Sequence, residues 1–234
     1  MDLGDFRYIL CPGTGALPHE ASLYNEIYSK WFQLWQDTMK GLGIDRPLYS
    51  ESFTRQHYFG SLYYQGKCVA LCSYRWTNAK ELSFAGDSYF STWYPLAIRH
   101  LKSRGDRIVI CGNFCLDPNY RGRIHGISVK DLLMGMVVET FMNSPSDCLA
   151  GAVRVDRKMN DLTVRWGAKL IAENVDSGLG DRVDMIGFFR DIVEKTQPHE
   201  LRDLARKLWV EKQVLGRNTI EFDLEQRTSI KRTA

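Results

Sequence analysis

The residues with the clearest chemical potential in this sequence form a loop, residues 116–128, that carries two arginines and two glycines. The arginines, Arg121 and Arg123, can make charge-assisted hydrogen bonds to an anion. The glycines, Gly122 and Gly126, let the backbone approach such an anion closely, and the free N–H groups of a following helix would point at it. The loop therefore predicts a phosphate site, which we interpret as the pyrophosphate site of a cofactor with a nucleotide tail.

This loop lies between a predicted strand and a predicted helix. Residues 107–114 are apolar and rich in β-branched side chains, which is typical of a buried strand. After the loop, apolar residues recur at helical spacing from Val129 to Phe141. A strand, a loop and a helix N-terminus in this order suit phosphate binding. An ordinary surface turn ahead of an amphipathic helix is the alternative.

The strand, loop and helix together resemble motif A of the GCN5-related N-acetyltransferases (GNAT), in which the loop holds the pyrophosphate of coenzyme A. The family pattern is Gln/Arg-x-x-Gly-x-Gly/Ala. Counted from Arg121, the last glycine falls on Gly126 but Ile124 replaces the first. Counted from Arg123, Gly126 and Ser128 take the two small positions. The resemblance implies that coenzyme A contacts Cys115, Leu116, Arg121, Gly122, Arg123, Ile124, His125, Gly126, Ile127 and Ser128.

A second segment, residues 156–168, resembles the later GNAT motif Asn-x-x-Ala-x-x-Leu-Tyr-x-x-x-Gly-Phe in its spacing. Leu162 and Gly167 match the family residues, whereas Asp156 stands at the Asn position and Thr163 at the Tyr position. In the family the Asn helps hold the cofactor arm, and the Tyr often protonates the leaving thiolate. The resemblance therefore implies the fold, with Asp156 as a further cofactor contact, more strongly than a complete catalytic set.

The rest of the chain fits the same architecture. With 234 residues, 44% of them apolar, the chain is long enough for one large packed domain. Periodicity predicts a helix over 20–39, a strand hairpin over 57–76, a helix over 91–103, strands over 169–175 and 183–189, and a helix over 197–215. We predict an α/β (α+β) fold with a GNAT-like, mostly antiparallel central sheet flanked by helices over residues 1–190. Residues 191–234 would form a C-terminal helix, packed on that domain, and a loose tail.

Charge and cysteine content exclude several classes. A formal net charge of +3 is too mild to indicate nucleic-acid binding. No apolar run approaches membrane-spanning length and the N-terminus lacks a signal-peptide pattern, so we expect a cytoplasmic protein. The six cysteines lie mostly in strand-like apolar runs, which favours buried reduced thiols over disulfides or metal ligands. We predict no metal, and a dimer role for the C-terminal helix stays open.

The layout also resembles the acyl-homoserine-lactone synthases and the long-chain N-acyl amino acid synthases. Those enzymes carry an arginine at the end of the third strand, where Arg75 stands. Arg75 could bind an acceptor carboxylate, with a structural salt bridge as the alternative. Trp31, on the first helix, could line the acceptor site, and Trp93, in the aromatic segment 78–106, could line a pocket for an acyl chain longer than acetyl. Packing in the core is the alternative for both.

The resemblance implies direct attack of an amine on the thioester carbonyl of an acyl-CoA or acyl-carrier-protein donor. A backbone N–H at the end of the strand before the loop would polarise that carbonyl. Asp117, His57 or Glu173 would take up the amine proton. Because no tyrosine follows Tyr120, Cys115 or water would protonate the leaving thiolate.

Three functions stay open at this point. The first is an N-acyltransferase that uses an acyl-CoA or acyl-carrier-protein thioester to acylate a small-molecule amine. The second has the same chemistry with a long-chain donor and an amino-acid-like acceptor. It is favoured by the aromatic residues at 84–101 and by Arg75, and also by the mild basicity of the chain, since carrier proteins are acidic. The third is a non-catalytic CoA-binding or interaction module. A Cys115–His125 nucleophile pair would be a separate class, but we expect His125 to contact phosphate or solvent.

Overall fold

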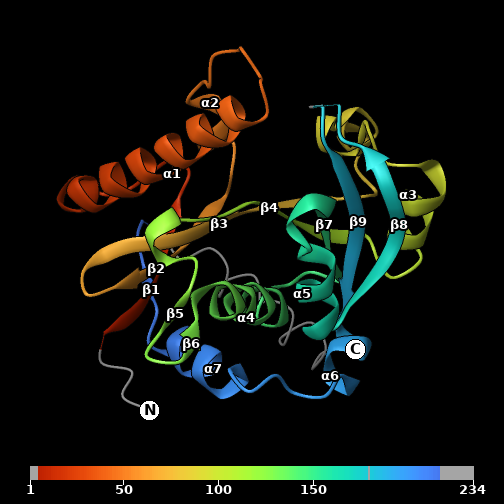
Figure 1. Cartoon of the computed structure of the whole chain (residues 1–234). Coiled ribbons are helices and arrows are strands. Elements are labelled where there is room, and N and C mark those ends of the chain that lie inside the picture. Colours follow the sequence, from red (N-terminus) through yellow and green to blue (C-terminus); the bar gives the residue numbers. More distant parts are fainter. Residues whose placement is uncertain (1–4, 179, 217–234) are drawn as a thin grey trace, which may run out of the picture.

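A mixed sheet forms the centre of the molecule, as Figure 1 shows. The computed structural model describes residues 5–178 and 180–216. Within them the strand order is β10-β1-β2-β3-β4-β7-β9-β8, and neighbours are antiparallel except β1/β10 and β4/β7. The strands are β1 (Phe6–Pro12), β2 (Tyr58–Tyr64), β3 (Lys67–Asn78), β4 (Arg107–Leu116), β7 (Cys148–Arg154), β8 (Ala168–Asp176), β9 (Arg182–Phe189) and β10 (Gln213–Val214). The predicted mixed, mostly antiparallel sheet is confirmed.

Helices cover both faces of this sheet (Figure 1). One face packs on α4 (Val129–Met142), α5 (Met159–Arg165) and α7 (Arg202–Val210). On the other face, α1 (Ala21–Gly41) and α2 (Glu51–Thr54) cover β1 to β3. The β7–β9 half of that face packs on α3 (Pro95–Lys102), and α6 (Arg190–Lys195) follows β9. The helix predicted over 91–103 thus begins later, at Pro95, because proline fits the first turn of a helix.

The strands are apolar on both faces because both faces are covered. In β1, Tyr8 and Leu10 belong to the core around α4, whereas Ile9 and Cys11 belong to the core under α1. This alternation follows from the two-residue period of a strand. Central burial also explains why α4 is apolar around its circumference: most of its residues are buried between the sheet and α7.

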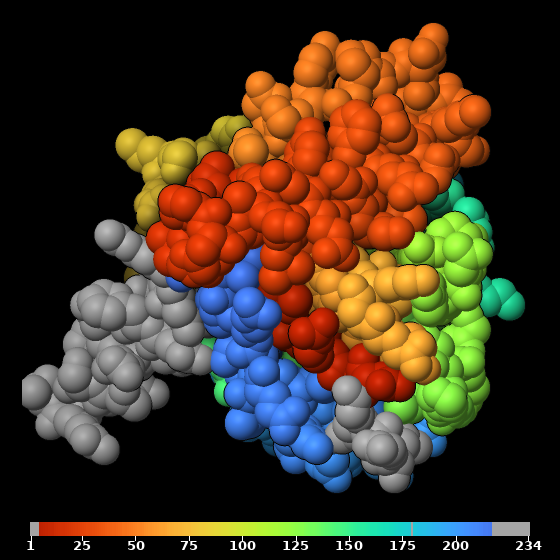
Figure 2. Space-filling model, turned by 90° about the vertical axis from the view of Figure 1, so that its left-hand side faces the viewer, coloured from red at the N-terminus to blue at the C-terminus, as the bar shows by residue number. Residues whose placement is uncertain are grey.

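The C-terminal segment contributes a strand as well as a helix. The helix predicted over 197–215 ends at Val210, and β10 then pairs in parallel with β1, with Ile9 opposite Gln213. Leu215 is fully buried and its N–H donates to the Leu10 carbonyl over 2.9 Å. The free edge of β1 therefore takes an extended partner where the local sequence pattern indicates helix. Figure 2 shows the end of this segment beside β1 and α1, and the predicted tail from residue 221 lies outside the described residues.

No helix in residues 5–178 and 180–216 is long and apolar enough to cross a membrane. In the same ranges, no group of three or more His, Cys, Asp and Glu side chains is placed to hold a metal ion. The six cysteines are all free thiols, four of them buried and two partly buried.

Candidate functional site

The parallel strands β4 and β7 separate after a short contact. Only three residue pairs join them, from Ile108 opposite Cys148 to Ile110 opposite Ala150. The three paired β4 residues, 108–110, are buried, whereas all six from Cys111 to the strand end at Leu116 are half-buried. Beyond residue 110, the backbone of β4 therefore lacks a strand partner on its β7 side. The sheet opens at this point into a gap.

On its other side β4 carries a β-bulge. The pairing with β3 shifts between Leu71 and Ser73, so that two residues of β4, Asn113 and Phe114, oppose one residue of β3. Asn113 has a φ of +51°, in the left-handed region that asparagine tolerates better than most residues. Its Nδ2 donates to Ser73 Oγ over 2.7 Å, and its Oδ1 accepts from Trp31 Nε1 over 3.3 Å. The bulge is therefore bonded both to β3 and to α1.

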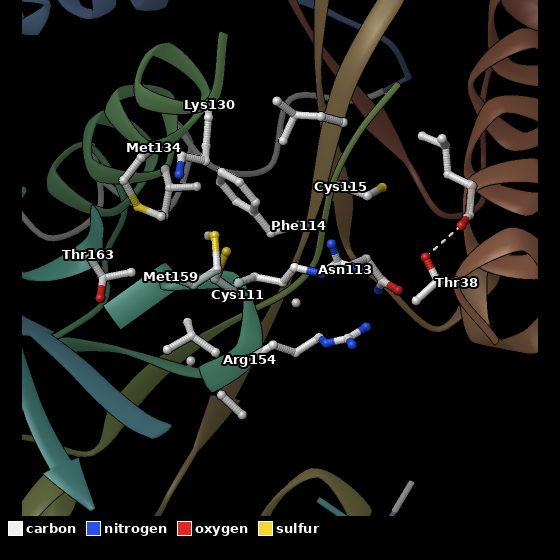
Figure 3. Close-up of a pocket in the computed structure, with 18 of the residues that line it drawn as sticks. Thr38, Cys111, Asn113, Phe114, Cys115, Lys130, Met134, Arg154, Met159 and Thr163 are labelled. Atoms are coloured by element: carbon white, nitrogen blue, oxygen red, sulfur yellow. Dashed lines mark hydrogen bonds between the residues drawn. The ribbon is translucent and has the colours of Figure 1, made fainter. Parts of the chain in front are cut away.

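A cavity of about 500 Å³ occupies the gap between β4 and β7, and Figure 3 shows the side chains around it. Its apolar and sulfur-bearing lining comes from α4, α5 and the sheet and includes Cys111, Phe114, Met134, Val137, Met159 and Ile186. The last two turns of α1 form part of the wall, with Thr38 on the side opposite Met134 in Figure 3. A cavity with this lining suits an extended apolar group.

Four cations line the cavity, and two of them are engaged by carboxylates. Arg154 and Arg157 both pair with Asp156, at 2.9 and 3.3 Å. The side chains of Arg121 and Lys130 make no hydrogen bond or ion pair within residues 5–178 and 180–216. Two free cations beside an apolar cavity fit the phosphates at the end of a coenzyme A or pantetheine arm.

The predicted phosphate loop contains a two-stranded hairpin. Strands β5 (Arg123–Ile124) and β6 (Ile127–Ser128) pair around a two-residue turn, His125 and Gly126, with φ of +48° and +82°. Arg123 Nη1 donates to the Gly126 carbonyl over 2.9 Å, and His125 Nε2 lies 2.9 Å from Tyr64 Oη. Two isoleucines flanking His-Gly favour this hairpin. Of the ten predicted loop contacts, Cys115, Leu116 and Arg121 line the cavity, whereas the seven that do not are Gly122, Arg123, Ile124, His125, Gly126, Ile127 and Ser128.

The N-terminus of α4 is capped by its own side chains. Ser128 Oγ accepts from the Asp131 N–H over 3.3 Å and donates to Asp131 Oδ2 over 2.6 Å. Burial raises the pKa of Asp131, but hydrogen bonds from Ser128 and Arg165 outweigh it, so this pKa lies below its usual value. A carboxylate thus already occupies the position that favours an anion. Among the cations that line the cavity, Arg121 and Lys130 keep their charges unpaired within the described ranges.

Two predicted catalytic groups lie at the end of β4. Asp117 is buried, and burial raises its pKa. Hydrogen bonds from Lys30 and the Asn119 N–H outweigh this effect, so the pKa of Asp117 lies below its usual value. Its Oδ2 lies 2.9 Å from Lys30 Nζ, so it ties α1 to β4 and does not line the cavity. Cys115 does line the cavity. Burial and two neighbouring thiols raise the pKa of Cys115 well above its usual value, so this thiol is protonated at neutral pH.

The three predicted substrate contacts do not line the cavity. Trp31 is 1% exposed and packs beneath the bulge, and Trp93 is buried in the core under α3. Both guanidinium NH groups of Arg75 bond to Asp87, over 2.7 and 2.8 Å. The alternatives for these residues, core packing and a structural salt bridge, describe what the structure shows. The aromatic segment 78–106 therefore covers the sheet and leaves the cavity to other elements.

The remaining predicted residues also lie apart from the cavity lining. His57 Nδ1 accepts from the Trp76 N–H over 3.0 Å, and desolvation together with Arg75 lowers the pKa of His57. Glu173 is exposed on the edge strand β8. Asp156, the predicted cofactor contact of the second motif, pairs with the arginines described above. These positions give no support to a base at His57 or Glu173.

Five residues of the site were missed at the sequence level or had no assigned role. Asn113 interrupts an apolar strand pattern, and asparagine is depleted in strands, which could have indicated the bulge. Lys130, Arg157 and Asp37 line the cavity but had no signal beyond their charge. Thr163, at the tyrosine position of the second motif, also lines it, but its hydroxyl donates to the Asn160 carbonyl over 2.9 Å.

Comparisons with known proteins agree on the fold. No protein-family model matches the chain significantly, and no curated protein sequence does. A CoA-dependent acyl-homoserine lactone synthase, BjaI, solved with SAM and isopentyl-CoA, superposes with a TM-score of 0.58 at 9% identity, over 95% of this chain and 99% of that one. The AHL synthase LasI gives 0.53 at 12% identity, over 84% and 100%.

A third structure is FeeM, an N-acyl amino acid synthase from uncultured soil microbes. It gives a TM-score of 0.51 at 12% identity, over 85% of this chain and 98% of that one. At such identities the likeness concerns the fold, and it extends over most of every chain compared. The chain therefore has the GNAT fold, and it is similar over most of its length to acyl-homoserine lactone and N-acyl amino acid synthases.

Proposed function

We propose that the protein is an N-acyltransferase that moves an acyl group from an acyl-CoA or acyl-carrier-protein thioester to a small-molecule amine. The observation that carries this proposal is the cavity between β4 and β7, which combines an apolar lining with two free cations, Arg121 and Lys130. The lining suits an acyl chain, and the cations suit the phosphate of the donor's tail. The GNAT fold supports the same activity.

The chain supplies positioning and electrostatics for direct attack. Beyond Ile110 the backbone of β4 runs along the gap without a partner on β7, so its amides are available to polarise a thioester carbonyl. The cavity holds donor and acceptor together, which lowers the entropic cost of their encounter. Of the acid and base groups predicted from the sequence, only Cys115 lines the cavity, and as a neutral thiol it can donate a proton but not accept one.

The lining supports donors longer than acetyl. The residues at 84–101 that were expected to form an acyl pocket pack elsewhere, and side chains of α4 and β9 such as Met134, Val137, Ile186 and Phe188 take this place. Their contribution to a cavity of about 500 Å³ gives room for a chain of several carbons. We therefore infer a medium- or long-chain donor.

A non-catalytic CoA-binding module is the second candidate. It is favoured by Thr163, which stands where the family has its acid and has a buried hydroxyl bonded to the backbone. This candidate predicts donor binding without turnover. The N-acyltransferase predicts donor binding together with turnover.

The test measures donor binding and turnover separately. Thermal unfolding with CoA, acetyl-CoA and a series of longer acyl-CoAs measures binding, because a ligand of the folded state at a hundredfold excess over Kd adds about 2.7 kcal/mol of stability. Release of free CoA or carrier-protein thiol in the presence of a panel of amines measures turnover. We expect a shift that grows with chain length, and amine-dependent release.

Arg121→Ala and Lys130→Ala should each raise the KM for the donor about tenfold, since a charge-assisted hydrogen bond contributes about 1.5–3 kcal/mol. Lys169→Ala is the matched control, because Lys169 is an exposed cation on β8 outside the cavity. Binding without release under any amine would leave the non-catalytic module. Absence of binding by CoA donors and by an acyl-carrier protein would refute both candidates.

A further inference from the structure

The free charges around the cavity are few. On the acidic side, Asp117 pairs with Lys30 and Asp156 pairs with Arg154. Asp37 is the single carboxylate that lines the cavity within the described part of the chain. It is exposed and makes no side-chain hydrogen bond or ion pair in residues 5–178 and 180–216. The cavity thus presents free cations where the donor tail would lie and one free carboxylate on α1.

Asp37 lies on the face of α1 that is turned to the cavity. Leu34, Asp37, Thr38 and Gly41 all line it and follow the spacing i, i+3, i+4, i+7 of one helix face. These are the last two turns of α1, where the helix dipole places partial negative charge. The Thr38 hydroxyl donates to the Leu34 carbonyl over 2.8 Å, the dashed line in Figure 3, so it does not offset that charge. Asp37 and the helix dipole therefore make this wall attractive to a cation, whereas the exposed Lys40 in the last turn, which does not line the cavity, offsets part of the dipole.

We propose that this face of α1 binds the acceptor through a positive group other than the reacting nitrogen, so that the acceptor is a diamine or a similar amine with a cationic tail. The inference rests on the proposed function. Asp37 does not hold the reacting nitrogen itself, because a neighbouring carboxylate favours the protonated ammonium and an ammonium has no lone pair for attack. Arg75, the group expected to bind an acceptor carboxylate, is already bonded to Asp87.

The transfer step balances without a further reagent. The lone pair of the free amine forms the C–N bond, and the C–S bond breaks with its electron pair remaining on sulfur. The attacking nitrogen loses one proton, and the leaving thiolate takes up one proton. The second ammonium of the acceptor stays on Asp37 and keeps its charge throughout.

The test compares three acceptors of one length with a single acyl-CoA donor: putrescine, butylamine and γ-aminobutyrate, whose tails are cationic, neutral and anionic. We expect kcat/KM to be highest for putrescine and lowest for γ-aminobutyrate, with the difference mainly in KM. Series of diamines, monoamines and amino acids with shorter and longer spacers guard against a wrong length. Equal values for the three classes at every length, or a preference for the amino acid, would overturn the inference.

Asp37→Asn should raise the KM for the best diamine about tenfold, the loss expected for one charge-assisted contact. Asp37→Lys should reverse the order in favour of γ-aminobutyrate, which a merely structural role would not do. Asp45→Asn, an exposed aspartate after α1 and outside the cavity, removes the same charge and should change nothing.

The two proposals can fail separately. Acyl transfer without a preference for a cationic tail would refute the role of Asp37 and leave the N-acyltransferase in place. Failure of every amine, diamines included, to accept an acyl group from a bound donor would overturn the N-acyltransferase together with the inference that rests on it, and donor binding alone would then leave the non-catalytic module.

Discussion

The indole Nε1 of Trp31 donates a hydrogen bond to Oδ1 of Asn113 over 3.3 Å, and this bond joins α1 to the bulge of β4. Trp31 is 1% exposed, so the donor has no access to water and depends on this acceptor. The helix that lines one wall of the cavity and the strand that borders the gap are therefore held in one fixed relation. The other end of the same amide is bonded to Ser73.

Ser73→Ala should lower the free energy of unfolding by about 1 kcal/mol, because it removes the hydrogen bond that the half-buried Asn113 Nδ2 donates to Ser73 Oγ. Urea unfolding of both proteins measures this change. Ser61→Ala is a matched control, since Ser61 on β2 is also fully buried but its hydroxyl has no hydrogen-bond partner among residues 5–178 and 180–216. We expect Ser61→Ala to be neutral or stabilising. Equal losses in the two variants would contradict the role given to the Asn113 amide.

Asn113→Ala and Asn113→Gly separate the side-chain bonds from the backbone conformation. Both variants lose the contacts to Trp31 and Ser73, so both should be less stable and slower in acyl transfer than the wild type. Alanine also pays for the φ of +51°, about 1–2 kcal/mol, which glycine avoids. The glycine variant should therefore unfold at higher urea than the alanine variant. If the alanine variant is as stable, the backbone of the bulge is not held in the left-handed region.

Much of the fold could be predicted from the sequence because it depends on local periodicity. The helical spacing from Val129 to Phe141 and the apolar run at 107–114 correspond to α4 and β4. The place where β4 and β7 part, directly after the pair Ile110 and Ala150, could not be located from local periodicity, because it depends on residues forty positions apart. The same holds for Asp37, whose place on the cavity depends on how α1 lies over the sheet.

The hairpin at His125 shows a different kind of failure. The local signal was present, since His125-Gly126 between two isoleucines matches a two-residue turn, but the glycines were assigned to phosphate binding. Arg75 shows a third kind, because Asp87 lies in a segment for which periodicity gave no contacts. Residue type and spacing thus predicted the strand and the helix beside the cavity, whereas the contacts of individual side chains depend on the tertiary structure.

Met134 offers a test of the acyl-chain lining. It is 3% exposed and lines the cavity from α4. Met134→Trp should fill the cavity and move the preferred acyl-CoA to a shorter chain, whereas Met134→Ala should leave more room and move it to a longer one. The measurement is kcat/KM for saturated donors of increasing length. Met134→Leu nearly conserves volume and serves as the control. A preference that does not move in either variant would place the acyl chain elsewhere.

Asp117 gives a pH-dependent prediction whose sign follows from its lowered pKa. The folded-state pKa lies below the unfolded-state value of about 3.9, so the unfolded chain binds the proton first as pH falls. The stabilisation is therefore complete above that value and is lost as pH falls through the folded-state pKa. At neutral pH, Asp117→Asn should cost about 1–3 kcal/mol, because Lys30 loses its partner.

Urea unfolding at neutral pH and at acid pH, below both pKa values, measures how the difference between wild type and Asp117→Asn changes. We expect this difference in unfolding free energy to disappear at acid pH. Asp45→Asn, which removes an exposed carboxylate for which no partner occurs in the described part of the chain, should show no comparable gap at either pH. An equal stability difference between wild type and Asp117→Asn at both pH values would mean that Asp117 stabilises the fold by packing. Its ion pair with Lys30 would then not fix α1 to the end of β4.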